Sequence, residues 1–338
     1  MAAKCWAQYT LQQDYLQGGN FFEQFSFFTA PDPTDGFVTY VDQATAQAAG
    51  LIQSSGNQVT ISVDDTSTTT TGRQSVRLTS LQSYQSGLFI IDLAHMPGSI
   101  CGTWPAFWTV GPDWPNQGEI DIIEGVNQNT MNAMTLHTGD GCTINNSGFS
   151  GTLSTSDCYT YAPNQASNAG CSIDATSGNT YGTGFNNAGG GVYAMELTAN
   201  SIAVYFFTRA SIPENVLSDS PDPSTWGEPL SYFSGDCDFA SKFTNQQIVF
   251  DVTFCGQWAG AVWPTSSCAS QFGSSCENYV GQNPSAFSES YWSINSLKVF
   301  ENTEHWPADD YASSTTRRPF HPAFQLETST TFDDHLIR

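Results

Sequence analysis

The sequence predicts an all-β fold, a sandwich or jelly roll built from two antiparallel sheets. Short runs of β-branched and aromatic residues recur along the chain, helical periods are few, and turn-forming residues separate the runs. The chain has 338 residues, and all-β sandwiches often reach this length as one domain. The sequence contains no internal repeat. We therefore expect residues 1–301 to form a single β-sandwich domain.

The expected strands follow from alternating or continuous apolar runs. Residues 9–29 carry seven aromatic residues, which predicts a packed entry strand with a short helical turn. Residues 42–49 are polar and rich in alanine, which predicts a loop or helical turn. The turn residues 198–201 predict a hairpin between the two strands that flank them. The expected strands after the entry strand are 37–41, 59–63, 75–79, 87–93, 103–110, a strand within 118–127, 131–138, 192–197, 202–207, 246–254 and 291–300.

Two segments depart from this strand pattern. Residues 139–191 are dense in Gly, Asn, Ser and Cys, and we expect a functional loop there that is held by cross-links and borders a cleft. Residues 302–338 alternate polar and acidic residues without periodicity. We expect this C-terminal tail to be disordered or vector-derived, with a linker toward a further domain as the alternative.

The charge balance excludes several classes of partner. Lys and Arg number 9 against 32 Asp and Glu, so the net charge is −23. This charge would repel nucleic acid and anionic membrane surfaces, whereas a neutral substrate meets no such barrier. No run of about 18 apolar residues is present, so we expect no membrane span. With no amphipathic helix or long bare edge strand evident, a monomer is the expected state.

Nine cysteines suggest an oxidising compartment. None forms a C-x-x-C pair, which gives no support to a zinc site or a redox motif. Eight lie within the expected domain, enough for up to four disulfides of open connectivity, and Cys5 is expected to be a free thiol. The sequence starts without a signal-peptide pattern, so we interpret it as a form that lacks its signal. A sequon at Asn145 also fits a secreted, extracellular protein.

The most informative stretch is residues 118–127, which read GEIDIIEGVN. Glu119 and Asp121 alternate with isoleucines at the period of a strand, whereas Glu124 has the wrong parity to share their face. A β-bulge near residues 122 and 123 would return Glu124 to the acidic face. The glutamates would then be roughly 13 Å apart along the strand. Leaning toward each other, they could approach the separation of about 5–5.5 Å that a retaining glycosidase needs.

Two simpler interpretations compete with a catalytic pair. The strand could be an edge strand with a solvated acidic face, or the three carboxylates could hold calcium or magnesium. Aromatic residues nearby favour a sugar, because tryptophans precede the acidic strand at 104, 108 and 114 and His137 follows on the next expected strand. Tryptophan faces stack on the apolar C–H faces of pyranose rings, which a bare ion would not require.

Residues 118–127, preceded by CGTWP at 101–105 and followed by NAMTLHT at 132–138, resemble the fungal endo-β-1,3(4)-glucanases (laminarinases) of glycoside hydrolase family 16. The resemblance extends from about residue 9 to residue 300. It implies a concanavalin A-like β-jelly roll with a concave substrate cleft. It also implies that Glu119 is the nucleophile, that Glu124 is the general acid/base, and that Asp121 tunes both. His137 could hydrogen-bond this cluster, although an isolated histidine is as often structural.

The resemblance also implies residues that would bind the glucan. Trp114 and Trp258 match family positions in the cleft, and Arg73 matches an arginine that donates to sugar hydroxyls. One of Trp104 and Trp108 is expected to face the cleft and the other the core. The full set of expected substrate-binding residues is Arg73, Trp104, Trp108, Trp114, Asn127 and Trp258.

Some features remain open at this level. Phe37 and Thr39 differ from the polar residues expected in the related enzymes, which leaves linkage and branch preference undecided. The resemblance implies no cofactor. A structural calcium ion occurs in some members, but no ligand set for it is readable here, and we expect no metal.

The sequence thus predicts a secreted, retaining endo-β-1,3-glucanase, with mixed-linkage 1,3(4)-glucan as a second substrate. The nearest alternative is a cell-wall glucan transglycosylase of the same fold, because only the acceptor differs. A non-catalytic glucan-binding protein is a third hypothesis. Such a protein would be expected to lack one of the acidic residues, whereas Glu119, Asp121 and Glu124 are all present.

Overall fold

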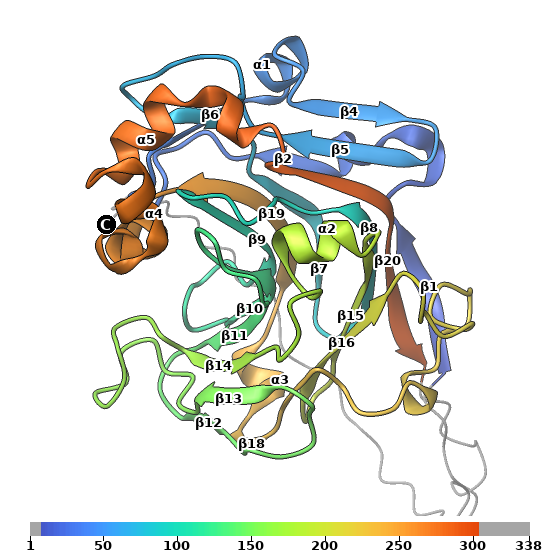
Figure 1. Ribbon diagram of the computed structural model, residues 1–338. Coiled ribbons are helices and arrows are strands. Elements are labelled where there is room, and N and C mark those ends of the chain that lie inside the picture. The colour runs from blue at the N-terminus through green and yellow to red at the C-terminus, as the bar shows by residue number, and fades with distance from the viewer. Residues whose placement is uncertain (1–7, 304–338) are drawn as a thin grey trace, which may run out of the picture. The chain divides into compact units, whose positions relative to one another are not determined.

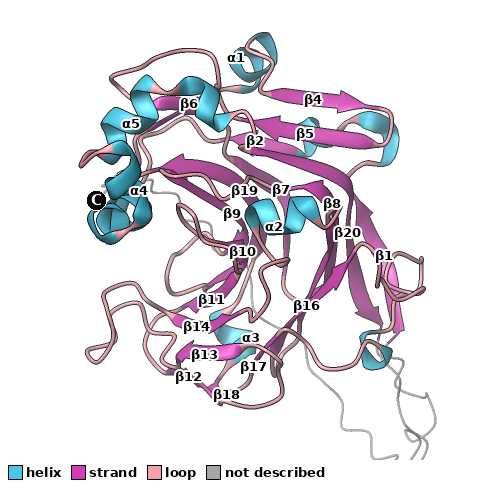
Figure 2. Cartoon of the chain, viewed as in Figure 1, coloured by secondary structure: helices cyan, strands magenta, loops and turns pink. Residues whose placement is uncertain are grey.

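The computed structural model describes residues 8–303, which form two large antiparallel sheets with few helices (Figures 1 and 2). Sheet A consists, in spatial order, of β17 (Ser231–Phe233), β16 (Ile202–Thr208), β15 (Gly191–Leu197), β8 (Gly87–His95), β20 (Tyr291–Thr303), β5 (Gln58–Ser62) and β4 (Ile52–Ser55), with β1 (Gln8–Asp14) also paired to β20. Sheet B consists of β13 (Thr152–Thr155), β14 (Cys171–Asp174), β11 (Ala133–His137), β10 (Glu119–Glu124), β9 (Thr103–Val110), β19 (Gln246–Phe254), β7 (Leu78–Tyr84) and β2 (Phe25–Phe27).

The remaining elements are short. Two small sheets pair β12 (Cys142–Ile144) with β18 (Gly235–Cys237) and β3 (Val38–Tyr40) with β6 (Arg73–Ser75). The α-helices are α1 (Gln43–Ala48), α2 (Gly182–Asn187), α3 (Phe239–Lys242), α4 (Ser267–Phe272) and α5 (Cys276–Gln282). Single helical turns are η1 (Gln17–Gly19), η2 (Phe21–Gln24), η3 (Pro223–Thr225), η4 (Gly256–Gly260), η5 (Trp263–Thr265) and η6 (Pro284–Phe287). The predicted all-β sandwich is therefore confirmed.

The main core lies between the two sheets. Phe250 of β19 packs 4.7 Å from the ring of Phe107 in sheet B and 5.9 Å from the ring of Trp292 in sheet A. All three side chains are buried, and burying one such ring contributes about 1.5–3 kcal/mol. β8 is covered on both faces, since Phe89 belongs to this core and Leu88 to a second cluster on the other side of sheet A. This explains why its sequence is almost continuously apolar.

Local predictions hold where the sequence pattern is strong. The hairpin forms between β15 and β16, and its turn is closed by a hydrogen bond from the Thr198 amide to the Ser201 carbonyl. The alanine-rich stretch becomes α1, because the Asp42 side chain caps it by accepting from the Thr45 amide at 2.7 Å.

The segment 139–191 is more regular than expected. It contains β12, β13, β14 and α2, and β14 pairs with β11 to widen sheet B beyond the acidic strand. Its short strands are polar on one side, so their composition resembles that of a loop. The prediction of a long irregular loop is therefore wrong for much of the segment.

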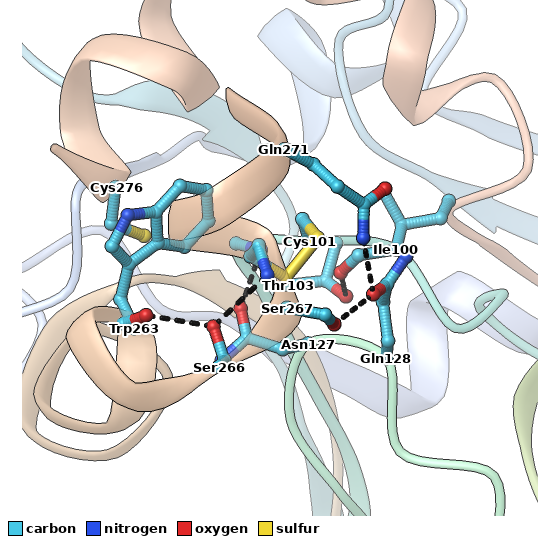
Figure 3. Close-up of a disulfide and its surroundings, with 12 residues drawn as sticks. Ile100, Cys101, Thr103, Asn127, Gln128, Trp263, Ser266, Ser267, Gln271 and Cys276 are labelled. Carbon is cyan, nitrogen blue, oxygen red and sulfur yellow. Dashed lines mark hydrogen bonds between the residues drawn. A yellow bond between two sulfur atoms is a disulfide. The ribbon is translucent and has the colours of Figure 1, made fainter. Parts of the chain in front are cut away.

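Four disulfides join the eight described cysteines, and their number is as predicted. They are Cys101–Cys268, Cys142–Cys237, Cys158–Cys171 and Cys255–Cys276. Cys142–Cys237 and Cys158–Cys171 cross-link the segment 139–191, as expected for this region. Figure 3 shows how Cys101–Cys268 attaches α4 to the start of β9, beside a hydrogen bond between Ser267 and Gln128. Cys5 lies outside the described residues.

The last strand of the described residues extends into the predicted tail. β20 continues to Thr303, so residues 302 and 303 of the predicted tail belong to a strand, while the rest of that tail lies outside the described residues. Among residues 8–303, no helix is long and apolar enough to cross a membrane.

Candidate active site

A β-bulge in β10 brings the acidic residues onto one face. Asp121 pairs with Trp108 of β9, the next pair is Ile123 with Phe107, and Ile122 between them has no partner. Because of this extra residue, Glu124 pairs with Ala106 and returns to the face that carries Asp121. The predicted bulge is confirmed. The isoleucines of β10 are all buried, so the acidic side chains project from the face of sheet B that is opposite the core, which we call the outer face.

The carboxyl groups of this strand strongly perturb one another. Asp121 is 2% exposed, and its pKa is raised well above the ordinary value by burial first, then by the charge of Glu119 and a hydrogen bond with it. The pKa of Glu124 is also raised well above normal, by burial first and then by Asp121. Two carboxyl groups with raised pKa values flank the bulge, and the raised pKa of Glu124 favours the protonated form that a proton donor needs.

Trp104 positions the Glu124 carboxyl directly. Its indole Nε1 donates to Glu124 Oε1 at 2.8 Å, and its ring lies edge-on to Trp258 with centroids 5.6 Å apart. Trp108 pairs with Asp121 across the ladder, so it occupies the outer face as well. The prediction that one of Trp104 and Trp108 faces the core is wrong, because residues four apart in a strand share a face. Trp114, in the loop between β9 and β10, is 39% exposed.

His137 joins the acidic cluster from β11. It pairs with Glu119, and its Nε2 lies 3.4 Å from Asp121 Oδ2. Single ligand atoms of Glu119, Asp121 and His137 lie within 4.8 Å of one another, a set that could hold a metal ion. The raised pKa of Asp121 opposes this, since metal ligation requires the deprotonated carboxylate.

Arg73 does not lie on the outer face. It is fully buried, and its guanidinium donates to the carbonyls of Val280, Asp64 and Ser67. It also lies 3.6 Å from Asp64 Oδ2. The predicted contact between Arg73 and a sugar is therefore wrong in this structure, because every direction of its guanidinium is already used to hold the surrounding loops.

Asn127 is likewise part of the framework. It is 4% exposed, its Oδ1 accepts from the Gly102 amide at 2.7 Å, and its Nδ2 donates to the Ala259 carbonyl at 2.9 Å. These bonds join the start of β9 to η4, the turn that carries Trp258 (Figure 3 labels Asn127). The predicted direct role of Asn127 in binding is not supported, because both ends of its amide are occupied by main-chain groups.

Sequence reasoning missed two charged residues on the outer face. Arg77 lies between two rings, with its guanidinium carbon 4.7 Å from the centroid of Phe28 and 5.0 Å from that of Trp108. Asp251 of β19 is buried nearby, and burial raises its pKa to about 7, although the positive charge of Arg77 opposes the rise. The signals were present: Arg77 alternates with the buried Leu78, and Asp251 interrupts an apolar strand.

The two positions that depart from the expected pattern have different surroundings. Phe37 is partly buried and packs against the core, whereas Thr39 of β3 is exposed. Phe37 thus serves packing in place of a polar contact.

Comparisons with known proteins identify the family of this chain. Residues 25–300 match the family model described as the XgeA-like, catalytic GH16 domain. An endo-1,3(4)-β-glucanase of Arthroderma benhamiae is 47% identical over 87% of this chain and 65% of its own length. A probable glycosidase of Schizosaccharomyces pombe is 45% identical over 87% of this chain and 69% of its own. The chain spans less than two thirds of the length of most of the curated relatives.

Two solved structures are also similar over their whole length. One is an elongating GH16 β-1,3-glucosyltransferase, 46% identical with a TM-score of 0.81, and covers 87% of this chain. The other is laminarinase 16A of Phanerochaete chrysosporium with 6-O-glucosyl-laminaritriose in donor and acceptor sites, 40% identical with a TM-score of 0.81 over the same share. The extent of the family match and the bulged acidic strand together show that this chain belongs to the GH16 family, as an XgeA-like catalytic domain.

Proposed function

We propose that this chain is a retaining endo-β-1,3-glucanase that hydrolyses internal linkages of laminarin-type glucans, with mixed-linkage 1,3(4)-glucan as a second substrate. The proposal rests on the bulge at Ile122, which puts Glu119 and Glu124 on one face, and on the burial of Glu124, which raises the pKa of its carboxyl and favours the protonated form. The curated relatives named endo-1,3(4)-β-glucanases support the choice of substrate.

The two glutamates divide the chemistry. Glu119 attacks the anomeric carbon while Glu124 protonates the departing glycosidic oxygen, which yields a glycosyl-enzyme ester and a shortened glucan. Glu124 is then a carboxylate, and it removes a proton from a water molecule that hydrolyses the ester with overall retention. Asp121, hydrogen-bonded to Glu119 and close to His137, orients the nucleophile and accommodates its change of charge.

Binding of the glucan uses the aromatic residues of the outer face. Trp104, Trp108, Trp114 and Trp258 offer ring surfaces for pyranose stacking. Arg77 replaces Arg73 as the proposed hydroxyl donor, since its guanidinium lies over the ring of Trp108 on the outer face. The proposed reaction requires no cofactor or metal, because proton transfer and nucleophilic attack are both supplied by carboxyl groups.

A glucan transglycosylase is a second candidate, favoured by the similarity to the elongating β-1,3-glucosyltransferase. The two reactions share the glycosyl-enzyme and differ only in whether water or a sugar hydroxyl attacks it. A non-catalytic binding role is disfavoured by the complete set of carboxyl groups.

The test is a reducing-sugar assay on laminarin, lichenan and a branched 1,3/1,6-glucan, with Glu119→Ser as the inactive control. Mass spectrometry of the products separates the two reactions: hydrolysis gives only shorter oligomers, whereas products longer than the substrate would establish transglycosylation. Activity of Glu119→Ser equal to that of the parent would overturn the assignment of the nucleophile.

We also propose that the protein acts outside the cell as a monomer. The four disulfides support an oxidising environment, and the fungal endoglucanase relatives are consistent with extracellular action.

A further inference from the structure

The bulge in β10 lies where this strand loses its partner on one side. β10 and β11 pair only at Glu119, Ile120 and Asp121. Past that point, the residues of β10 that lead to Glu124 have no paired residue in β11. A bulge with an open side can migrate along its strand, and a shift of one residue would turn Glu124 toward the core.

The side chain of Asn132 takes the place of the missing strand. Its Nδ2 donates to the Ile122 carbonyl at 2.8 Å, and its Oδ1 accepts from the Glu124 amide at 2.8 Å. A carboxamide carries the same donor and acceptor as a peptide group. Asn132 therefore makes the two hydrogen bonds that a neighbouring strand would make, one on each side of Ile123. They lie where β10 turns the Glu124 side chain back to the outer face.

Asn132 is itself held rigidly. It is 1% exposed, its amide donates to Thr180 Oγ1 at 3.2 Å, and its carbonyl accepts from the Ala175 amide at 2.8 Å. The Thr180 carbonyl accepts in turn from the hydroxyl of Tyr193 at 2.5 Å, and Tyr193 belongs to β15 of sheet A. The side chain that holds Glu124 is thus anchored to both sheets, and Asn132 is buried with both ends of its carboxamide bonded to main-chain groups of β10.

We propose that Asn132 is a positioning residue for the general acid/base Glu124, an inference that rests on the proposed function. It holds the main chain of Ile122 and Glu124 so that the Glu124 carboxyl meets both the Trp104 indole and the leaving oxygen. Asn132 touches neither substrate nor reacting atoms, so its effect is confined to the steps in which Glu124 gives or takes a proton.

The experiment compares kcat/KM of Asn132→Ala with that of the parent on two substrates that have different leaving groups. Laminarin has a poor leaving group that needs protonation, whereas 2,4-dinitrophenyl β-laminaribioside releases a stable phenolate without it. We expect kcat/KM on laminarin to fall about 10- to 100-fold, since a displacement of about 1 Å can cost that much. On the dinitrophenyl substrate the same constant should change by less than about threefold, because it reports the step before water attacks.

Asn127→Ala is the matched structural control. Asn127 is also buried and also holds two main-chain groups, but neither belongs to β10. Any loss in this variant should be equal on the two substrates. Asn132→Asp keeps the shape of the side chain but lacks the donor to the Ile122 carbonyl. It replaces Asn132→Ala in the kinetic comparison if Asn132→Ala does not fold. Failure of both variants to fold would show a general structural role and overturn the proposal.

The outcomes also separate this inference from the proposed function. A parent protein without activity on laminarin would refute the proposed function itself. An active parent combined with equal losses of Asn132→Ala on both substrates would refute only the positioning role of Asn132.

Discussion

Two arginines four residues apart have opposite surroundings, and their difference decides what each can do. Arg73 is buried among carbonyl groups, whereas Arg77 lies half-buried between the rings of Phe28 and Trp108. An even offset should leave both on one side of a strand, but β6 ends at Ser75 and β7 begins at Leu78, so Arg77 lies in the connection and the alternation does not extend to it. Arg73 therefore stabilises the fold, whereas Arg77 lies on the outer face, where it is available to a ligand.

Replacement of Arg77 should impair binding and leave the fold intact. We expect Arg77→Ala to lower kcat/KM on laminarin by about 10- to 100-fold. This is the effect of losing one hydrogen bond from a charged group to the glucan, which is worth about 1.5–3 kcal/mol. The melting temperature should change little. Kinetics and thermal unfolding of Arg77→Ala and Arg77→Lys measure this, and Lys should recover little activity because it lacks the planar group that stacks on Trp108.

Replacement of Arg73 should have the reverse effect. Arg73→Ala leaves the carbonyls of Val280, Asp64 and Ser67 without their donor, and breaking a buried charged network of this kind costs about 3–5 kcal/mol. Denaturant unfolding measures the loss. An unchanged unfolding free energy, together with a raised KM, would show that Arg73 contacts the glucan after all.

Asp251 should make stability depend on pH. Its pKa is about 7 in the folded protein because of burial and about 3.9 in an unfolded chain. The stability that the protonated group contributes is fully present below about pH 4 and is lost as pH rises through about 7. Asp251→Asn stays neutral, so its free energy of unfolding should exceed that of the parent by an amount on the order of 4 kcal/mol above this range.

Denaturant unfolding at a series of pH values measures this difference. Glu228→Gln removes an exposed carboxyl in a turn and serves as the matched charge control. Parallel pH profiles for Asp251→Asn and the parent would show that Asp251 is not responsible.

At the scale of elements, the loop before β14 packs against β11 beside His137. Gly170 has a positive φ of 59°, and a Cβ there would lie 2.4 Å from the Leu136 carbonyl oxygen and 2.9 Å from His137 Nδ1. The Cys158–Cys171 disulfide closes the same loop. The segment 139–191 therefore borders the site through its packing on β11.

Gly170→Ala should displace His137 and so lower kcat on laminarin by about tenfold or more. Gly141→Ala is the matched control, because Gly141 also has a positive φ, of 88°, but has nothing within 4 Å of its added Cβ. Gly141→Ala should lose about 1–2 kcal/mol of stability from the backbone strain alone, and Gly170→Ala should lose more because its Cβ also meets the Leu136 carbonyl. Equal kcat values in the two variants would refute the link between this loop and His137.

At the scale of the whole molecule, the proposed reaction depends on carboxyl groups and on no metal ion. Dialysis against EDTA should leave both laminarin hydrolysis and the melting temperature unchanged, because the raised pKa of Asp121 disfavours the carboxylate form that a metal ion would bind. Recovery of lost activity by added calcium would show that the group of Glu119, Asp121 and His137, or another site, does require an ion.

The sequence alone determined the features that depend on local periodicity and spacing. Strand alternation predicts the sandwich, and the wrong parity of Glu124 predicts the bulge that the structure shows. The motif around this strand was sufficient for the family. Each of these properties depends on residues that are close together in the sequence, so the sequence pattern can reveal it.

Only the tertiary structure decided which polar residues face outward and which hold the framework. Arg73 donates to a carbonyl 207 positions away in the chain, and Asn127 and Asn132 look equivalent until their partners are known. The disulfide pairs and the raised pKa of Asp251 likewise depend on residues that are distant in sequence. Burial and hydrogen-bond partners are set by the packing of the two sheets, which no local pattern specifies.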